Sequence, residues 1–410
     1  MNLRRDAWQI MQTAIRDAQP AEAVARAMDD LSFGSGRIFP VAIGKAAWPM
    51  AKAACDRLGS RVTDGIVITK YHHSQGAVGP LRIREAGHPV PDANSFAATA
   101  EAMALVENLS AEDTVLFLIS GGGSALFELP LIPEADLRRL TAELLACGAD
   151  IVEMNTIRKR FSAVKGGRFA AHCAPAQVRA IILSDVVGDR LDMIASGPAC
   201  PDSTTAQDAA AIAEKYHLTM TPQMRQLLET ETPKELHNVT TTVTGSVRQL
   251  CRSAETVCRE LGYEPITLTD CLSCTARDAG VFLAGIARTH AAGGRKLAFL
   301  AGGETVVHLT GSGLGGRNQE LALAAAPGLA GLPNAAVFSF GSDGTDGPTD
   351  AAGGYVDGAT WNALRAKGLD VYRVLQNNDA YHALEAVDGL LKTGPTGTNV
   401  NDLSVLLLDA

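Results

Sequence analysis

The sequence lacks long apolar runs, paired cysteine motifs and an excess of positive charge. No stretch approaches about 18 uncharged apolar residues, so we expect no membrane-spanning helix. Residues 1–19 hold no signal-peptide core and Asp6 interrupts them early, which favours a cytoplasmic protein. Among eight cysteines, only Cys271 and Cys274 form a CxxC motif, and a zinc site needs a second pair. We therefore expect reduced thiols.

Acidic residues outnumber basic residues and give a formal net charge of −9. This balance argues against nucleic acid or an anionic membrane as the main partner. Apolar residues make up 46% of the chain and charged residues 20%, which is ordinary globular composition and enough for a core. We expect a small-molecule substrate, and the composition leaves the oligomeric state open, a homodimer included.

Apolar strand-like runs alternate with helical patterns along the whole chain. This alternation predicts an α/β protein of two domains, each a mainly parallel sheet flanked by helices, with the active site in the interdomain cleft. A length of 410 residues fits two or three domains at roughly 150 residues each. The polar segment 233–238 is the candidate boundary, which gives domains 1–236 and 237–410.

Two strand-like runs in the first half end in residues that suit an anion. The run 37–44 ends in Gly44 and Lys45, which places a cation where ligands bind in open α/β sheets, although no Walker A motif is present. The run 114–120 is followed by glycines and two serines that can approach an anion closely. These residues are Ser120, Gly121, Gly122, Gly123 and Ser124. A tight turn is the alternative interpretation of this second motif.

A basic stretch and an acidic strand end follow. Residues 155–170 carry five positive charges and no acid, a local reversal that favours anion contact over a solvated helix face. The strand-like run 179–189 ends in Asp185 and Asp189, whose carboxylates can accept a proton or hold Mg²⁺.

The second half is organised around residues 298–323. An apolar run ends in Gly302, Gly303 and Glu304, and the glycine-rich loop 311–316 then leads into Arg317. Glycines before a helix expose backbone N–H groups to an anion, and a guanidinium offers a fork of donors for phosphate or carboxylate. The strand-like run at 335–341 empties into a loop with Asp343, Asp346 and Asp350, which lacks the EF-hand spacing.

Seven blocks, in order, resemble the class II glycerate kinases. They are GKAAWPMA, SGGGSALFELP, NTIRKRFSAVKGGR, LSDVVGD with SGP, LAGGETVVHLTGSGLGGRNQELAL, GSDGTDGPTDAAGG and TGPTGTNVNDL. That family has an N-terminal glycerate kinase domain and a C-terminal MOFRL domain. The resemblance implies phosphorylation of D-glycerate to 2-phosphoglycerate with ATP and Mg²⁺. Members are also named hydroxypyruvate reductases of the tartrate utilisation pathway.

The resemblance assigns roles to individual residues. Lys45 and Arg317 match the family's proposed catalytic pair, and Asp185 belongs with them. We expect ligand or phosphate contacts from residues of both halves: Gly44, Ser120, Gly121, Gly122, Gly123, Ser124, Asn155, Arg158, Gly302, Gly303, Glu304, Gly313, Gly315, Gly316, Asp343 and Asn377. Asp185 and Asp189 are the candidate metal ligands. Which glycine loop holds which ligand stays open.

An NAD(P)H-dependent hydroxypyruvate reductase is the alternative function. GSGLGG matches the dinucleotide motif G-x-G-x-x-G, and Asp343 follows the next strand. Three features oppose it: the following helix begins RNQE, Asp343 lies further than about 20 residues downstream, and no N-terminal βαβ unit carries the motif. A non-catalytic sugar-acid-binding protein would not need the clustered Lys, Arg and Asp residues.

Overall fold

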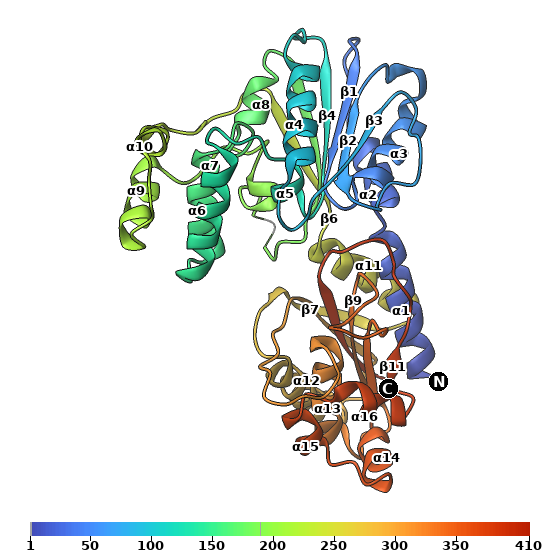
Figure 1. Cartoon of the computed structure of the whole chain (residues 1–410). Helices are drawn as coiled ribbons and strands as arrows, with labels where there is room; N and C mark the ends of the chain where they lie inside the picture. Colours follow the sequence, from blue (N-terminus) through green and yellow to red (C-terminus); the bar gives the residue numbers. More distant parts are fainter. Residues whose placement is uncertain (1, 189) are drawn as a thin grey trace. The chain divides into compact units, whose positions relative to one another are not determined.

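The structure is a computed structural model that describes residues 2–188 and 190–410. The chain forms two compact units (Figure 1). Ala23–Thr244 makes the N-terminal unit, and the chain up to Glu22 joins Gly245–Ala410 to make the C-terminal unit. In the described residues no helix is long and apolar enough to cross a bilayer.

The N-terminal unit is built on a six-stranded sheet with the order β3-β2-β1-β4-β5-β6. The pairs β3–β2, β2–β1, β1–β4 and β4–β5 are parallel. Its strands are β1 (Ile38–Ile43), β2 (Ile66–Lys70), β3 (Arg82–Ala86), β4 (Thr114–Ile119), β5 (Gln177–Leu183) and β6 (Val239–Gly245). Strand order reverses between β1 and β4, which is the switch point at which doubly wound sheets bind ligands.

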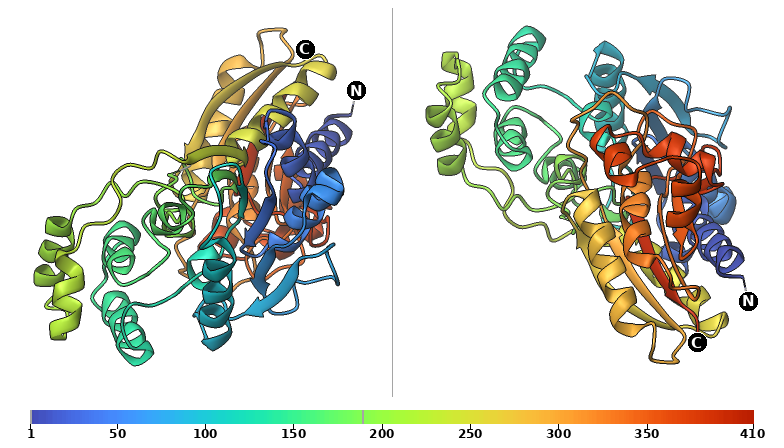
Figure 2. Two further views of the ribbon diagram at one scale, coloured as in Figure 1. Left: turned by 90° about the horizontal axis from the view of Figure 1, so that it is seen from above. Right: turned by 90° about the horizontal axis from the view of Figure 1, so that it is seen from below.

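Helices cover both faces of this sheet and extend beyond it (Figures 1 and 2). They are α2 (Pro20–Asp29), α3 (Ala47–Leu58), α4 (Ala93–Val106), α5 (Gly123–Leu126), α6 (Glu134–Ala146), α7 (Ile151–Arg160), α8 (Arg168–His172), α9 (Ala206–Lys215) and α10 (Pro222–Glu229). The helices α6, α7, α9 and α10 share a small core of their own, in which Leu140, Ile157, Phe161 and Met224 are buried.

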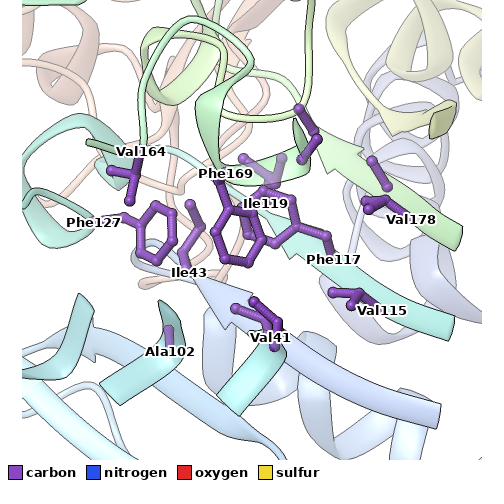
Figure 3. Packing of buried hydrophobic residues seen from close by; sticks show 14 of the residues in the cluster. Val41, Ile43, Ala102, Val115, Phe117, Ile119, Phe127, Val164, Phe169 and Val178 are labelled. Atoms are coloured by element: carbon purple, nitrogen blue, oxygen red, sulfur yellow. The ribbon is translucent and has the colours of Figure 1, made fainter. Parts of the chain in front are cut away.

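The main core of the N-terminal unit lies between the sheet, α4 and the segment around α8 (Figure 3). β1 and β4 are buried along their whole length, as expected for central parallel strands. Phe117 of β4 packs against Phe169, with ring centroids 4.6 Å apart, and Phe169 meets Phe127 edge to face at 5.0 Å. This cluster fixes the chain on both sides of the glycine-rich turn that follows β4.

The C-terminal unit contains a second six-stranded sheet with the order β11-β10-β9-β12-β8-β7. Its strands are β7 (Glu264–Leu272), β8 (Leu297–Gly303), β9 (Ala335–Gly341), β10 (Gly353–Asp357), β11 (Leu390–Leu391) and β12 (Asp402–Leu408). β7 and β8 are parallel, whereas β12 is antiparallel to both β8 and β9, and β10 is antiparallel to both β9 and β11. Four strands therefore share one direction and two run against them.

Helices flank both faces of the second sheet. The face that carries Phe299 and Val337 packs against α12 (Ala276–His290) and α13 (Arg317–Leu329). The short helices α14 (Thr360–Ala366), α15 (Val371–Gln376) and α16 (Ala380–Ala386) extend this layer. The helices α11 (Val247–Glu260) and α1 (Leu3–Asp17) cover the other face. Tyr263 donates a buried hydrogen bond of 2.9 Å to Asp6, which ties α1 to this unit.

The prediction of an α/β fold with two helix-flanked sheets is confirmed. The four strand pairs named above for the first sheet are parallel, as predicted. The expectation of a mainly parallel second sheet needs a correction, because most of its strand pairs are antiparallel. The final apolar run, β12, inserts between β8 and β9 in the reverse direction. The observed units also differ from the division 1–236 and 237–410: most of β6 lies in the N-terminal unit, and α1 belongs to the C-terminal unit.

A buried ion pair holds the segment that follows β4. The Lys165 ammonium is fully buried and donates to the backbone carbonyls of Ser124 at 2.9 Å and Phe127 at 3.1 Å. Its Nζ also lies 2.9 Å from a carboxylate oxygen of Glu128, which is 1% exposed. Burial lowers the pKa of Lys165 to about 8, against the opposing charge of Glu128. The Lys165 side chain thus holds the backbone at both ends of α5 in place.

We predict that Lys165→Met strongly destabilises the protein, because it leaves the Glu128 carboxylate buried without a partner. Removing one member of such a pair costs about 3–5 kcal/mol. Urea unfolding followed by circular dichroism measures the effect. The control is Lys215→Met, which removes an exposed Lys–Glu pair with Glu153 in the same unit and should leave the midpoint nearly unchanged. The double variant Lys165→Met/Glu128→Leu should regain most of the loss. Wild-type stability of Lys165→Met would contradict the account.

Candidate active site

The loops that follow β1 and β4 touch at the switch point of the first sheet. The backbone N–H of Lys45 donates to the carbonyl of Gly121 at 2.8 Å. The N–H of Ala46 donates to Ser120 Oγ at 3.1 Å, and that hydroxyl donates to the carbonyl of Ile43 at 3.1 Å. Two of the predicted ligand motifs therefore meet at one place in the fold.

Gly44 permits this contact. Its φ of 108° lies in the region that favours glycine, and a Cβ there would stand 2.3 Å from Ser120 Oγ. The predicted residues Gly44 and Ser120 thus build the crossing of the two loops. Ser120 is buried, and its hydroxyl makes both of these hydrogen bonds to the backbone of the loop after β1 and of β1 itself.

The first two glycines of the turn after β4 face the predicted catalytic groups. A Cβ on Gly121 would lie 2.2 Å from a carboxylate oxygen of Asp185. A Cβ on Gly122 would lie 3.0 Å from the His88 ring and 3.3 Å from Cγ of Lys45. The absence of side chains at these glycines therefore gathers Lys45, His88 and Asp185 around one turn.

A cavity of about 400 Å³ opens beside this turn. Its polar lining includes Ser124, Asn155, Arg158, Asp185 and Arg190. Its apolar lining includes Pro89, Ile151, Val186 and Val187. His88 lines it as well, and burial, followed by the charges of Lys45 and Lys70, lowers the pKa of this histidine. Lys45 is not part of the described lining, but its side chain lies next to Gly122.

A strained segment supports the wall of the cavity. Ala195 and Ser196, with φ of 51° and 61°, adopt left-handed conformations that are costly for residues with a side chain. The buried Ser196 hydroxyl donates to Asn155 Oδ1 at 2.8 Å and lies 3.0 Å from Ser124 Oγ. This network orients Asn155 and Ser124, two predicted ligand residues.

The charged side chains of the basic stretch 155–170 mostly make contacts inside the N-terminal unit. Arg158 lines the cavity and donates to the carbonyl of Ser124 at 3.2 Å. The buried Lys159 pairs with Asp202 at 3.0 Å, and Arg160 pairs with Glu231 at 3.1 Å. Arg168 donates to backbone carbonyls. The stretch is therefore neither a solvated face nor a general anion surface.

In the C-terminal unit, three oxygen atoms of two carboxylates hold Arg317. Its Nε and Nη2 donate to the two oxygens of Asp402 at 2.5 and 3.0 Å, and its Nη1 donates to Glu304 at 2.6 Å. Burial would lower the pKa of Arg317, but the hydrogen bond and charge of Asp402 outweigh it and raise the pKa above its usual value. The guanidinium is fixed in orientation by a bidentate contact.

The N-terminus of α13 already holds an anion, which is a carboxylate of the chain itself. Asp346 accepts from the backbone N–H groups of Gln319 at 2.9 Å and Asn318 at 3.1 Å. Burial raises the pKa of Asp346 to about 6, against these hydrogen bonds. The expectation that this terminus faces a ligand anion is corrected, because Asp346 caps it.

The glycine-rich loop 311–316 packs closely on residues 377–380. A Cβ on Gly313 would lie 2.4 Å from Cβ of Asp379, and a Cβ on Gly316 would lie 2.3 Å from the Asp346 carboxylate. Asn378 accepts from the N–H groups of Thr310 and Gly311 at 2.7 and 2.9 Å. The glycines of this loop thus allow close packing against the rest of the chain, in addition to any contact that they make with a ligand.

A second cavity, of about 750 Å³, lies within the C-terminal unit and is lined in part by this loop. The predicted residues that line it are Glu304, Gly313, Gly315, Gly316, Arg317 and Asp343. Asp346, Glu320 and Asn378 line it as well. Gly302 and Gly303 instead belong to β8, where a Cβ would collide with Cys251 and Leu272. Asn377 is exposed and accepts from the N–H of Ser312 at 3.3 Å; its neighbour Asn378 lines the cavity.

The predicted metal ligands are described only in part. Asp185 lines the cavity of the N-terminal unit, and Asp189 lies outside the described residues. Within residues 2–188 and 190–410, no group of three or more His, Cys, Asp or Glu side chains could hold a metal ion. Mg²⁺ in kinases commonly takes one or two carboxylates together with substrate phosphates, so Asp185 fits this ion as a single protein ligand.

Sequence reasoning missed several residues that organise the site. Asp402 holds Arg317 from the last strand, and Asn378 holds the glycine loop with a φ of 55°. Ser196 lies in the SGP segment that accompanies the LSDVVGD block. The sequence signal for Asp402 is a carboxylate between the polar loop 393–401 and the apolar run of the last strand, but its partner is 85 residues away.

Two family models match this chain. Residues 6–229 match the family described as a domain of unknown function, DUF4147, and residues 297–402 match the MOFRL family. A D-glycerate 2-kinase of Thermotoga maritima is 49% identical, with 99% of each chain covered. A glycerate 2-kinase of Pyrococcus horikoshii is 40% identical over 100% of this chain and 98% of that protein.

Solved structures and a differently named relative complete the comparison. The crystal structure of a glycerate kinase from Thermotoga maritima matches with a TM-score of 0.94 at 49% identity, over 99% of both chains. A Pyrococcus horikoshii protein matches with a TM-score of 0.95 at 40% identity, over 100% of this chain and 99% of that one. A protein of Agrobacterium vitis, provisionally named hydroxypyruvate reductase, is 39% identical over 91% of this chain and 100% of its own length.

Proposed function

This chain belongs to the glycerate kinases that carry a MOFRL domain, and we propose on that premise that it phosphorylates D-glycerate with ATP to give 2-phosphoglycerate. The observation that supports this function best is the pair of cationic sites. Lys45 lies at the switch point beside Asp185, and Arg317 is fixed by Asp402 and Glu304. Phosphoryl transfer relies on positioned positive charge more than on covalent chemistry.

Each residue then has a role in that reaction. Lys45 and Arg317 neutralise charge on the transferring phosphoryl group. Asp185 orients or deprotonates the reacting hydroxyl, or binds Mg²⁺. Asp185 would hold Mg²⁺, which would supply positive charge that offsets the charge of the phosphates. That the two units jointly form the active site stays a prediction, as do a homodimer, a cytoplasmic location and a part in tartrate utilisation.

The reductase alternative is supported by names of relatives but less by the site. The motif GSGLGG does not form the tight turn that follows a strand in a dinucleotide site, because residues 304–310 separate it from β8. Asp346 caps the helix that would otherwise face the pyrophosphate. Its strand β8 also has an antiparallel neighbour, β12, unlike the strand of a βαβ unit.

We predict that the protein releases ADP from ATP and Mg²⁺ only when D-glycerate is added. A coupled assay for ADP measures this reaction, and L-glycerate serves as the matched substrate control. In parallel, hydroxypyruvate with NADH or NADPH should give no enzyme-dependent loss of nicotinamide absorbance. Nicotinamide oxidation without ADP release would overturn the kinase assignment.

We predict that Lys45→Ala and Arg317→Ala each lower kcat at least a hundredfold and change KM for ATP much less. A cation at the transferring group stabilises the transition state more than the ground state, and its loss costs on the order of 3 kcal/mol or more. Arg317→Lys should recover only part of the rate, because an ammonium cannot reproduce the bidentate contact with Asp402.

The control for Arg317 is Arg277→Ala. Arg277 also pairs with a buried carboxylate at α13, that of Glu320 at 2.8 Å, but it is not part of the described cavity lining. Its loss should lower stability without a comparable loss of kcat. Circular dichroism confirms folding of each variant. A folded Arg317→Ala protein with the wild-type kcat would remove Arg317 from the mechanism.

A further inference from the structure

We propose that the cavity of the N-terminal unit is the ATP site, with the adenine base against its aliphatic wall and the phosphates toward the turn Ser120–Ser124. This inference rests on the proposed kinase function and assigns one of its two substrates to one of the two cavities. It is carried by the lining, the charge and the place of the cavity in the sheet.

The aliphatic wall is the first observation. Ile151, Val186 and Val187 line the cavity, and Ile151 is 64% exposed although it is a large apolar residue. A flat purine would cover such side chains and remove apolar surface from water. D-Glycerate carries an oxygen on every carbon atom and gains little from an aliphatic wall. The wall therefore suits the base of a nucleotide.

Charge distinguishes the two cavities. Arg158 and Arg190 line the cavity of the N-terminal unit with Asp185 as its acid. Arg190 also pairs with Asp192 at 3.2 Å, and Lys45 lies next to Gly122. The cavity of the C-terminal unit is lined by four carboxylates and by one cation, Arg317, whose donors are already shared with Asp402 and Glu304. The four are Glu304, Glu320, Asp343 and Asp346. The first lining therefore favours a polyphosphate more than the second does.

Position in the sheet agrees with this assignment. The turn Ser120–Ser124 follows β4 and meets the loop after β1, so the cavity stands at the carboxyl edge where strand order reverses. Open α/β sheets bind nucleotides at this point. A volume of about 400 Å³ lies within the usual range for small-molecule and cofactor sites, and it is large for a three-carbon acid.

The test is the substitution Ile151→Asp. Ile151 is the first residue of α7, where an added carboxylate is tolerated by the helix dipole. It should raise KM for ATP at least tenfold and leave KM for D-glycerate within twofold. Calorimetric titration with the non-hydrolysable analogue AMP-PNP and Mg²⁺ should show the same loss of affinity. Circular dichroism confirms folding, and Ile151→Ala, with a smaller rise of about threefold, serves if the first variant unfolds.

The control is Leu145→Asp. Leu145 is 65% exposed and lies near the end of α6, outside the described lining, so all three constants should match the wild type. A rise in KM for D-glycerate with ATP affinity unchanged would overturn the proposal, as would wild-type constants in Ile151→Asp. If Ile151→Asp weakens AMP-PNP binding but the wild type makes no ADP with D-glycerate, the nucleotide site stands and the proposed substrate fails.

Discussion

The reversal of strand order between β1 and β4 is the constraint on which the N-terminal unit depends. Both strands are central and buried, and the loops after them are joined by the hydrogen bond from Lys45 to Gly121. Because Gly44 has no side chain, the two loops can cross in direct contact. The same crossing presents Lys45 beside Asp185 and His88, so the architecture of the sheet also sets the chemistry of its edge.

The C-terminal unit depends on a different constraint, which is the fixed orientation of one arginine side chain. Asp402 begins β12 and Glu304 directly follows β8, so the two carboxylates lie at the same end of this antiparallel pair, and together they orient the guanidinium of Arg317. Asp346 caps α13, the helix that Arg317 begins. A group fixed before substrate binds need not reorganise during the reaction, which is how charged side chains contribute most to catalysis.

The sequence predicted the α/β class and the residues at strand ends, because apolar runs and glycine turns are local signals. Lys45, the turn Ser120–Ser124 and Arg317 could be found in this way. The antiparallel insertion of β12 could not, since an apolar run carries no direction. Asp402 and Asn378 were missed because their partners are distant in sequence. Some residues of the basic stretch were expected to contact an anion, but Lys159, Arg160 and Lys165 form ion pairs inside the unit, for which the sequence has no local pattern.

Phosphorus NMR of the reaction product tests the central claim, transfer of a phosphoryl group to the 2-hydroxyl of D-glycerate, most directly. The protein is incubated with D-glycerate, ATP and Mg²⁺, and the proton-coupled spectrum is recorded. The account predicts one new phosphomonoester signal split into a doublet, because carbon 2 carries a single hydrogen. A triplet would place the phosphate on carbon 3, and hydrolysis to inorganic phosphate alone would show that glycerate is not the acceptor. Either result would contradict the account.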